Sequence, residues 1–249
     1  MISENITDQF EFDVSYSKAK PIRLLFCAYR PWALEIFKNI QNKIKNLKTR
    51  HGSTLKLVTT PNSLLQEAQE SEWDIIVLVG WSWKVPSSVL NNNYVIGMHP
   101  SDLPAYAGGS PIQNQILDGV KNTNASIFKL TPNFDEGPII SKHEISLEGH
   151  LSQVFSSIGY ATYEMLVDII KRWPNKLPEV SQDKTKGFVK KRIQPQNSEL
   201  KKKAIPKMTC EKLWDVIRCR EDPYPNVWLE DKTGRLIIKH VEFEPKKKK

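Results

Sequence analysis

Residues 74–80 read Asp74-Ile-Ile-Val-Leu-Val-Gly80, an uninterrupted apolar run between an acidic residue and a glycine. The run has the length of a strand, and polar residues do not alternate with apolar ones inside it. This pattern is typical of a parallel strand that is covered on both faces of its sheet. It is far too short to cross a bilayer. We therefore expect a central strand here and interpret the neighbouring sequence outward from it.

Strand and helix patterns alternate around this run. Before it we expect a strand at 22–28, a helix from Pro31 to about Asn46, a strand at 55–59 and a short helix at 63–69. After it, a strand is expected at 94–98. This order predicts an α/β protein with a doubly wound (Rossmann-like), mainly parallel sheet. No GxGxxG motif follows the first strand, which disfavours a dinucleotide cofactor.

The second half of the chain extends this pattern and then changes character. We expect a helix at 111–119, strands at 125–130 and 138–145, and a long helix that Ser152 caps. The predicted organisation is an amino-terminal arm at 1–20, a main domain at 21–175, a linker at 176–206 and a small α+β carboxyl-terminal subdomain with a basic tail at 207–249. Thr209 should begin a helix in that subdomain, and residues 231–234 should form a hairpin turn.

Composition narrows the class of protein. The chain has 249 residues, of which 26% are charged, and a net charge of +8. Lys246–Lys249 supply four of those charges and Lys201–Lys203 form another run, so we expect solvated lysine tails and no nucleic-acid partner. The three cysteines show no CxxC spacing, which predicts neither a zinc site nor a disulfide framework. The first thirty residues contain acidic side chains and no continuous apolar core, so we expect a cytoplasmic protein without a membrane partner.

Two loop segments contain the residue types needed for proton transfer. His99 follows an apolar strand, which places it at the carboxyl edge of the sheet, where open α/β sheets bind ligands. Asp135 lies in another loop, within Asn133-Phe-Asp-Glu-Gly137. Imidazole titrates near neutrality and a carboxylate can orient it, so the pair is a candidate catalytic site. From these residues alone, two structural loop positions remain the alternative interpretation.

Three motifs together resemble a known family. They are His99-Pro-Ser-Asp-Leu-Pro104, Gly108-Gly-Ser-Pro-Ile-Gln113 and Asp135-Glu-Gly137. In order and spacing they are similar to the signature of the formyltransferases that use N10-formyltetrahydrofolate, over roughly residues 21 to 200. The Gly-Gly-Ser-Pro variant looks most like the sugar N-formyltransferases. Asp222-Pro-Tyr-Pro-Asn226 also resembles the carboxyl-terminal region of the sugar and tRNA enzymes.

The resemblance implies roles for His99 and Asp135 as the catalytic residues. The family places an asparagine two residues before the histidine, where this chain has Gly97. That asparagine helps bind the oxyanion of the reaction, and losing one such donor typically costs about 2.7–4 kcal/mol of transition-state stabilisation. Glycine would leave room for Ser101, Asn114 or a backbone N–H to replace it. The alternatives are a slow enzyme or a catalytically silent protein that binds folate and a sugar nucleotide.

The resemblance also implies binding residues. The pterin of N10-formyltetrahydrofolate, the expected cosubstrate, would lie against the segment Trp81, Ser82, Trp83, Lys84 and Val85. The loop Pro132, Asn133 and Phe134 would close its other side. A substrate loop would consist of Ser101, Tyr106, Gly108, Gly109 and Ser110. No metal is expected.

The implied acceptor is a nucleotide-linked amino sugar, such as a dTDP-4-amino-4,6-dideoxyhexose. Such an enzyme would serve surface polysaccharide (lipopolysaccharide O-antigen) biosynthesis, and the family's sugar enzymes are commonly homodimers. A methionyl-tRNA formyltransferase is the alternative enzyme. Those enzymes carry a carboxyl-terminal barrel of nearly a hundred residues, whereas about forty-five residues follow Ile205 here.

Overall fold

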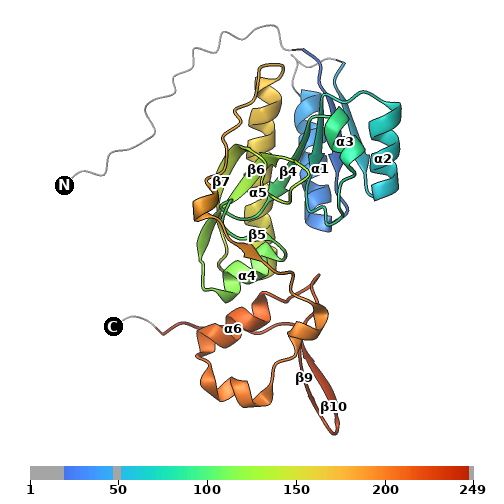
Figure 1. Cartoon of the computed structure of the whole chain (residues 1–249). Helices are drawn as coiled ribbons and strands as arrows, with labels where there is room; N and C mark the ends of the chain where they lie inside the picture. The colour runs from blue at the N-terminus through green and yellow to red at the C-terminus, as the bar shows by residue number, and fades with distance from the viewer. Residues whose placement is uncertain (1–19, 47–51, 247–249) are drawn as a thin grey trace, which may run out of the picture.

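A six-stranded sheet is the centre of the computed structural model, which describes residues 20–46 and 52–246. The predicted arm at 1–20 lies outside the described residues, apart from Lys20. The strands run in the order β2-β1-β3-β4-β6-β7, and β1 to β4 are parallel whereas β6 and β7 are antiparallel (Figure 1). Their bounds are β1 (Arg23–Cys27), β2 (Thr54–Val58), β3 (Ile75–Leu78), β4 (Val95–His99), β6 (Asn122–Lys129) and β7 (Ile139–Ser146).

Helices cover both faces of the sheet, because the central strands are apolar on both sides. In β1, Leu24 and Phe26 pack into one core with α1 (Pro31–Asn46) and α5 (Leu151–Arg172). Leu25 and Cys27 point to the opposite face and pack with α2 (Pro61–Glu70) and α3 (Ser87–Asn92). The doubly wound fold predicted from the sequence is confirmed. The short helix α3 is an addition that the apolar pattern did not reveal.

The start of α5 differs from the prediction. Ser152 was expected to cap this helix, but it lies inside the first turn, and His150 occupies the N-cap position. The side-chain oxygen of Gln153 accepts a hydrogen bond from the backbone N–H of His150 at 2.9 Å. That contact satisfies an amide that the helix itself leaves unpaired, so the helix begins two residues earlier than a serine cap would require.

Residues 176–206 are attached to the main domain at several points. A two-residue strand, β8 (Val189–Lys190), pairs in parallel with β5 (Ala107–Gly108). The amide of Gln182 donates hydrogen bonds to two carbonyl oxygens in the 135–137 loop. Three 3-10 turns complete the segment: η2 (Lys184–Lys186), η3 (Pro195–Ser198) and η4 (Lys202–Lys207). The predicted linker therefore helps to build the main domain's surface, and the boundaries at 175 and 206 stay a proposal.

The last part of the chain packs beside α4 (Pro111–Leu117) through α6 (Cys210–Arg218). Thr209 caps α6 as expected, with its hydroxyl accepting from the Lys212 N–H. Strands β9 (Val227–Asp231) and β10 (Gly234–Ile238) form the predicted hairpin, which extends away from the sheet in Figure 1. Among the described residues, no helix combines the length and the apolar composition needed to cross a membrane.

Candidate active site

A cleft of about 770 Å³ opens at the carboxyl ends of β3 and β4. Its walls come from the loops after these strands, the start of α4, the 131–135 loop and three residues from the last third of the chain, Arg192, Ile193 and Tyr224. This is the sheet edge where the parallel strands β1 to β4 all end, and where doubly wound proteins bind ligands. His99 and Asp135 both line the cleft.

His99 is the last residue of β4, not the first loop residue that the sequence predicted. Its side chain is only 9% exposed. The Nε2 atom lies 2.9 Å from the carbonyl oxygen of Tyr106. Because a carbonyl oxygen only accepts hydrogen bonds, Nε2 carries the proton of the neutral ring. The other ring nitrogen, Nδ1, faces Asp135 and lies 3.7 Å from its Oδ2 atom.

Asp135 is held in place from two directions. Its Oδ2 atom accepts a hydrogen bond from the backbone N–H of Gly108 at 2.8 Å. The side-chain amide of Gln182 donates to the carbonyl oxygens of Asp135 and Gly137, each at 2.7 Å. Gly137 has no room for a side chain, since an added Cβ would lie 1.7 Å from the carbonyl oxygen of Lys129. The carboxylate is therefore fixed before any ligand binds.

Backbone strain concentrates around this pair. In the described part of the chain, three non-glycine residues have left-handed φ values: Tyr106 at 55°, Ser110 at 52° and Asp135 at 55°. Such conformations cost on the order of 1–3 kcal/mol each and persist where other contacts impose them. Those contacts exist here, because the Ser110 Oγ accepts the Ile193 N–H at 3.0 Å and Asp135 accepts from Gly108. All three residues belong to the segments that carry or contact His99 and Asp135.

The space beside Gly97 is occupied. An added Cβ at this position would lie 2.6 Å from Cδ1 of Leu130, so the expected opening at the cleft floor is filled by that side chain. The two proposed substitute side chains have other partners. Ser101 is fully buried and donates to the carbonyl oxygen of Ala105, while Asn114 donates to the carbonyl oxygens of Gly109 and Lys191. The expectation that either replaces the family asparagine is therefore not supported by their contacts.

The segment expected to hold the pterin lines one side of the cleft in full, from Trp81 to Val85. The rings of Trp81 and Trp83 lie 4.9 Å apart, and Tyr29 lies 4.4 Å from Trp83. The hydroxyl of Ser82 accepts from the Tyr29 hydroxyl at 2.8 Å. The indole N–H of Trp81 is buried without a hydrogen-bond partner. Pro132, Asn133 and Phe134 line the same cleft, and their binding role stays a prediction.

The expected substrate loop divides into two groups. Gly108, Gly109 and Ser110 line the cleft. Ser101 and Tyr106 do not, and they contribute through other residues. The Tyr106 hydroxyl donates to Asp118 at 3.1 Å, and burial together with that carboxylate raises the pKa of Tyr106 to about 12. Tyr106 thus stays protonated and anchored while its carbonyl oxygen orients His99.

Sequence reasoning missed several residues of the cleft, including Arg30, Trp32, Gln113, Arg192 and Tyr224. Arg30 follows β1 at the same sheet edge as His99, so the position of the strand ends was a usable signal. Its guanidinium lies 5.1 Å from the Tyr29 ring centre and 5.8 Å from that of Tyr224. Arg192 and Tyr224 reach the cleft only through tertiary folding.

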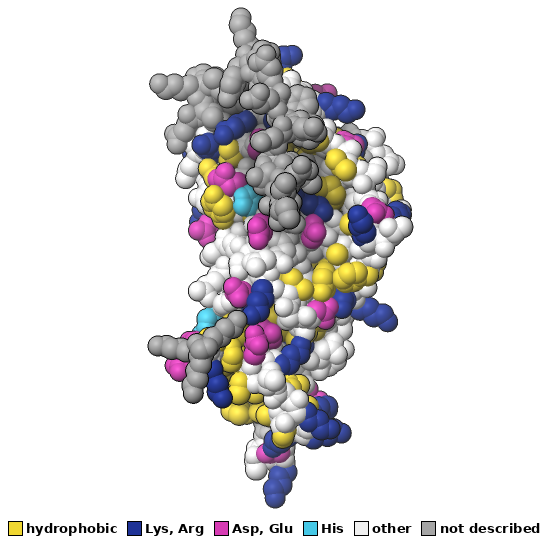
Figure 2. Space-filling view, turned by 90° about the vertical axis from the view of Figure 1, so that its left-hand side faces the viewer, with side chains coloured by type: hydrophobic (Ala, Val, Ile, Leu, Met, Phe, Trp, Pro, Cys, Tyr) yellow, Lys and Arg dark blue, Asp and Glu magenta, His cyan; other side chains and the backbone are white. Residues whose placement is uncertain are grey.

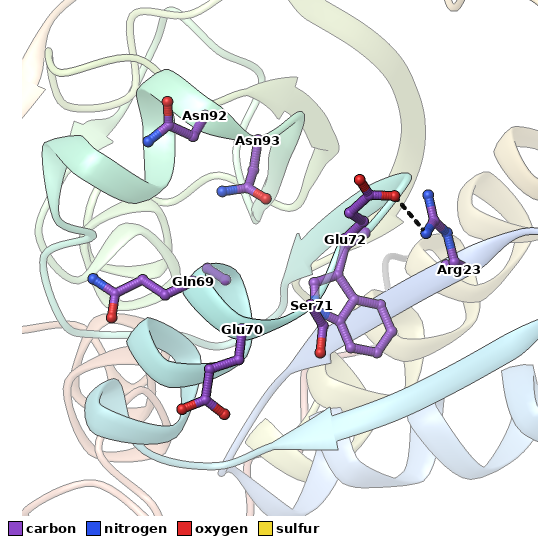
Figure 3. Close-up of a pocket in the computed structure, with 9 residues that line it drawn as sticks. Arg23, Gln69, Glu70, Ser71, Glu72, Asn92 and Asn93 are labelled. Carbon is purple, nitrogen blue, oxygen red and sulfur yellow. Dashed lines mark hydrogen bonds and ion pairs between the residues drawn. The ribbon is translucent and has the colours of Figure 1, made fainter.

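A second pocket of about 450 Å³ lies at the opposite, amino-terminal edge of the same strands. Figure 3 shows its polar side chains pointing in different directions, with one ion pair between Arg23 and Glu72 at 3.0 Å. Both partners are largely exposed, at 46% and 86% of the side-chain surface. Nothing in this pocket converges on a common point, so we assign it no chemistry.

Comparison with known proteins shows which family the chain matches. A family profile described as Formyl transferase matches residues 29–160, more than half of the chain. Methionyl-tRNA formyltransferase of Campylobacter curvus is 32% identical over 152 residues, which cover 61% of this chain and 49% of that protein. The chain spans about half the length of the first curated relatives that it matches.

Solved structures share the fold at low sequence identity. Methionyl-tRNA formyltransferase from Clostridium thermocellum has a TM-score of 0.79 at 21% identity, covering 90% of this chain and 94% of that one. A sugar N-formyltransferase from a Shewanella species has a TM-score of 0.68 at 15% identity, covering 90% and 99%. HypX from Aquifex aeolicus in complex with tetrahydrofolic acid has a TM-score of 0.65 at 14% identity, covering 84% and 36%.

Proposed function

Because this chain belongs to the formyl transferase family, we propose that its cleft transfers a formyl group from N10-formyltetrahydrofolate to the amine of a nucleotide-linked amino sugar. A dTDP-4-amino-4,6-dideoxyhexose is the acceptor class that we favour, in surface polysaccharide biosynthesis. The observation that carries the transfer chemistry is the approach of His99 Nδ1 to Asp135 Oδ2, 3.7 Å apart on the wall of the cleft.

The geometry of the pair suits acyl transfer. The amine nitrogen bonds to the formyl carbon, the bond from that carbon to N10 breaks, and one proton passes from the amine to N10. Asp135, held beside His99 by the Gly108 N–H, accepts the amine proton. Because Nε2–H is engaged by the Tyr106 carbonyl, His99 keeps Nδ1 free beside Asp135. Once Nδ1 takes up the amine proton by way of Asp135, it can donate to the oxyanion and pass the proton on toward N10.

The cleft also suits a flat heteroaromatic donor. Trp81 and Trp83 offer aromatic surface to such a ring. Trp81 to Val85 and Pro132 to Phe134 are therefore the proposed folate-binding residues. The volume of about 770 Å³ lies within the range of small-molecule binding sites.

Charge supports the choice of a phosphorylated acceptor. Arg30, Lys84 and Arg192 line the cleft and could pair with a diphosphate. The relative from Campylobacter curvus is named as a tRNA enzyme, which makes methionyl-tRNA the second candidate acceptor. On the face drawn in Figure 2, however, basic and acidic side chains of the described residues are interspersed rather than gathered into a basic surface for RNA.

Incubation of the purified chain with formyl-folate and each acceptor tests the proposal. We expect the amino sugar to gain the mass of one formyl group, with no formylation of methionyl-tRNA. Formylation of the tRNA alone would replace the proposed acceptor. Binding of both folate and sugar nucleotide by calorimetry, with no product, would instead establish a silent binding protein and connect that loss to Gly97.

A further inference from the structure

A cluster of two histidines and a glutamate lies outside the cleft, where three distant parts of the chain meet. His150 is the N-cap of α5, Glu221 follows α6, and His240 follows β10. One ligand atom from each of the three side chains lies within 4.8 Å of the other two. The residues are separated by up to 90 positions in the sequence, so no local sequence motif predicts the cluster.

The carboxylate of Glu221 is the centre of this cluster. Its Oε1 atom lies 2.6 Å from Nδ1 of His150 and 3.6 Å from Nδ1 of His240. The two imidazole rings stack with centres 4.3 Å apart. The Nδ1 atoms of both histidines thus lie next to the same carboxylate oxygen. We propose that His150, Glu221 and His240 bind a divalent transition-metal ion, most readily Zn²⁺.

The distances agree with zinc coordination. A tetrahedral zinc ion with bonds of about 2.0–2.1 Å holds neighbouring ligand atoms about 3.3 Å apart. The distance from Glu221 Oε1 to Nδ1 of His150 is shorter than that value, and the distance to Nδ1 of His240 is longer. A small increase in the first distance and a small decrease in the second would therefore create the site. Imidazole and carboxylate are ligands that zinc prefers, and a water molecule completes the four.

The hydrogen bonds that these three residues make to surrounding groups support the metal site more strongly. Metal-binding histidines usually donate their second ring N–H to a carboxylate, which fixes the ring and its tautomer. Here Glu242 lies 3.5 Å from Nε2 of His150 and 2.8 Å from Nε2 of His240. The remaining oxygen of Glu221, Oε2, accepts the backbone N–H of Leu151 at 3.0 Å. Each of the three ligands therefore has the outer partner that a metal site needs.

The nearby positive charge is already balanced. Arg218 donates to the carbonyl oxygens of Leu147 and Gly149, next to His150, and it forms an ion pair with Asp215 at 2.7 Å. Glu221 and Glu242 provide two negative charges for an incoming cation. Because the metal would connect the start of α5 to the segment after β10, its binding would fasten the last part of the chain to the main sheet.

Metal titration of the full chain, freed of any affinity tag and of bound metal by a chelator, tests this site. We expect one Zn²⁺ per chain by calorimetry, a tetrahedral Co²⁺ absorption band, and a higher melting temperature with Zn²⁺ than without. His240→Ala should weaken Zn²⁺ binding at least tenfold and abolish the melting shift, and its exposed side chain makes unfolding an improbable cause. Glu242→Gln should weaken binding about tenfold to a hundredfold, as an outer partner does.

His143→Ala is the matched control, since this half-buried histidine lies on β7 and contacts Tyr160 rather than the cluster. It should bind Zn²⁺ like the unchanged protein. The proposal is overturned if Zn²⁺ does not bind stoichiometrically, or if His240→Ala and His143→Ala bind it equally well. These measurements involve no substrate, so they are independent of formyl transfer.

Discussion

The cleft and the opposite pocket belong to two edges of one sheet, and they differ in how their side chains are held. At the carboxyl edge, His99 and Asp135 are mostly buried, and backbone groups determine their orientation. At the amino edge, Arg23 and Glu72 pair in solvent. Exposed ion pairs contribute little to stability. A cavity alone therefore does not make a site that can do chemistry. Its side chains must also be oriented by buried partners.

Replacement of His99 should have the largest effect, because it removes an oriented side chain at the carboxyl edge of the sheet. His99→Asn removes the ring nitrogen that faces Asp135, so kcat should fall by on the order of a hundredfold or more. Folate binding and the melting temperature should change little, which calorimetry and circular dichroism would check. An unfolded variant, or one with the full rate, would show that His99 serves the fold.

Gly97→Asn tests whether the cleft floor can accept the family's side chain. Because the new Cβ would meet Leu130 at 2.6 Å, we expect a loss of about 1–3 kcal/mol in unfolding free energy and no gain in rate. The double variant Gly97→Asn with Leu130→Ala makes room for the amide. A rate increase in the double variant alone would identify an oxyanion donor that the unchanged protein lacks, whereas a faster single variant would contradict the packing argument.

Gln182→Ala should have a smaller effect, because it acts through the backbone that carries Asp135. Loss of the two hydrogen bonds to the Asp135 and Gly137 carbonyl oxygens should lower kcat about fivefold to tenfold, or about 1–1.4 kcal/mol of transition-state stabilisation. KM for the folate should change less than kcat. Gln196→Ala, in the exposed turn η3, is the control, and equal effects of the two variants would refute the positioning role.

Arg23→Ala should change least, since it alters only the amino edge. We expect kcat to stay the same and the melting temperature to move by less than about 2 °C. A differential scanning measurement beside the rate assay would check both. A clear drop in rate would show that the two edges are coupled, and the contrast between them would then be wrong.

The sequence predicted what depends on local periodicity. Apolar runs and four-residue repeats placed α1 and the sheet strands within one or two residues, except that β6 begins three residues before its predicted start. The position of His99 and Asp135 near strand ends placed both in the cleft. The features that it missed depend on contacts between distant residues. Leu130 beside Gly97, Arg192 in the cleft wall and Gln182 under the Asp135 loop are examples. Helix α3 was missed because six residues show too little of a repeat.

The pairing of β8 with β5 limits where two related proteins can be joined into a chimera. A crossover placed just after α5 would keep His99 and Asp135 in the same parent sequence. It would separate them from Gln182 and Ile193, and from Lys190, whose carbonyl oxygen accepts the Gly109 N–H. The grafted partner would then supply these contacts from a foreign sequence. A chimera should therefore be joined beyond Ile193, so that the transplanted part starts after the last residue that supports the loops carrying His99 and Asp135.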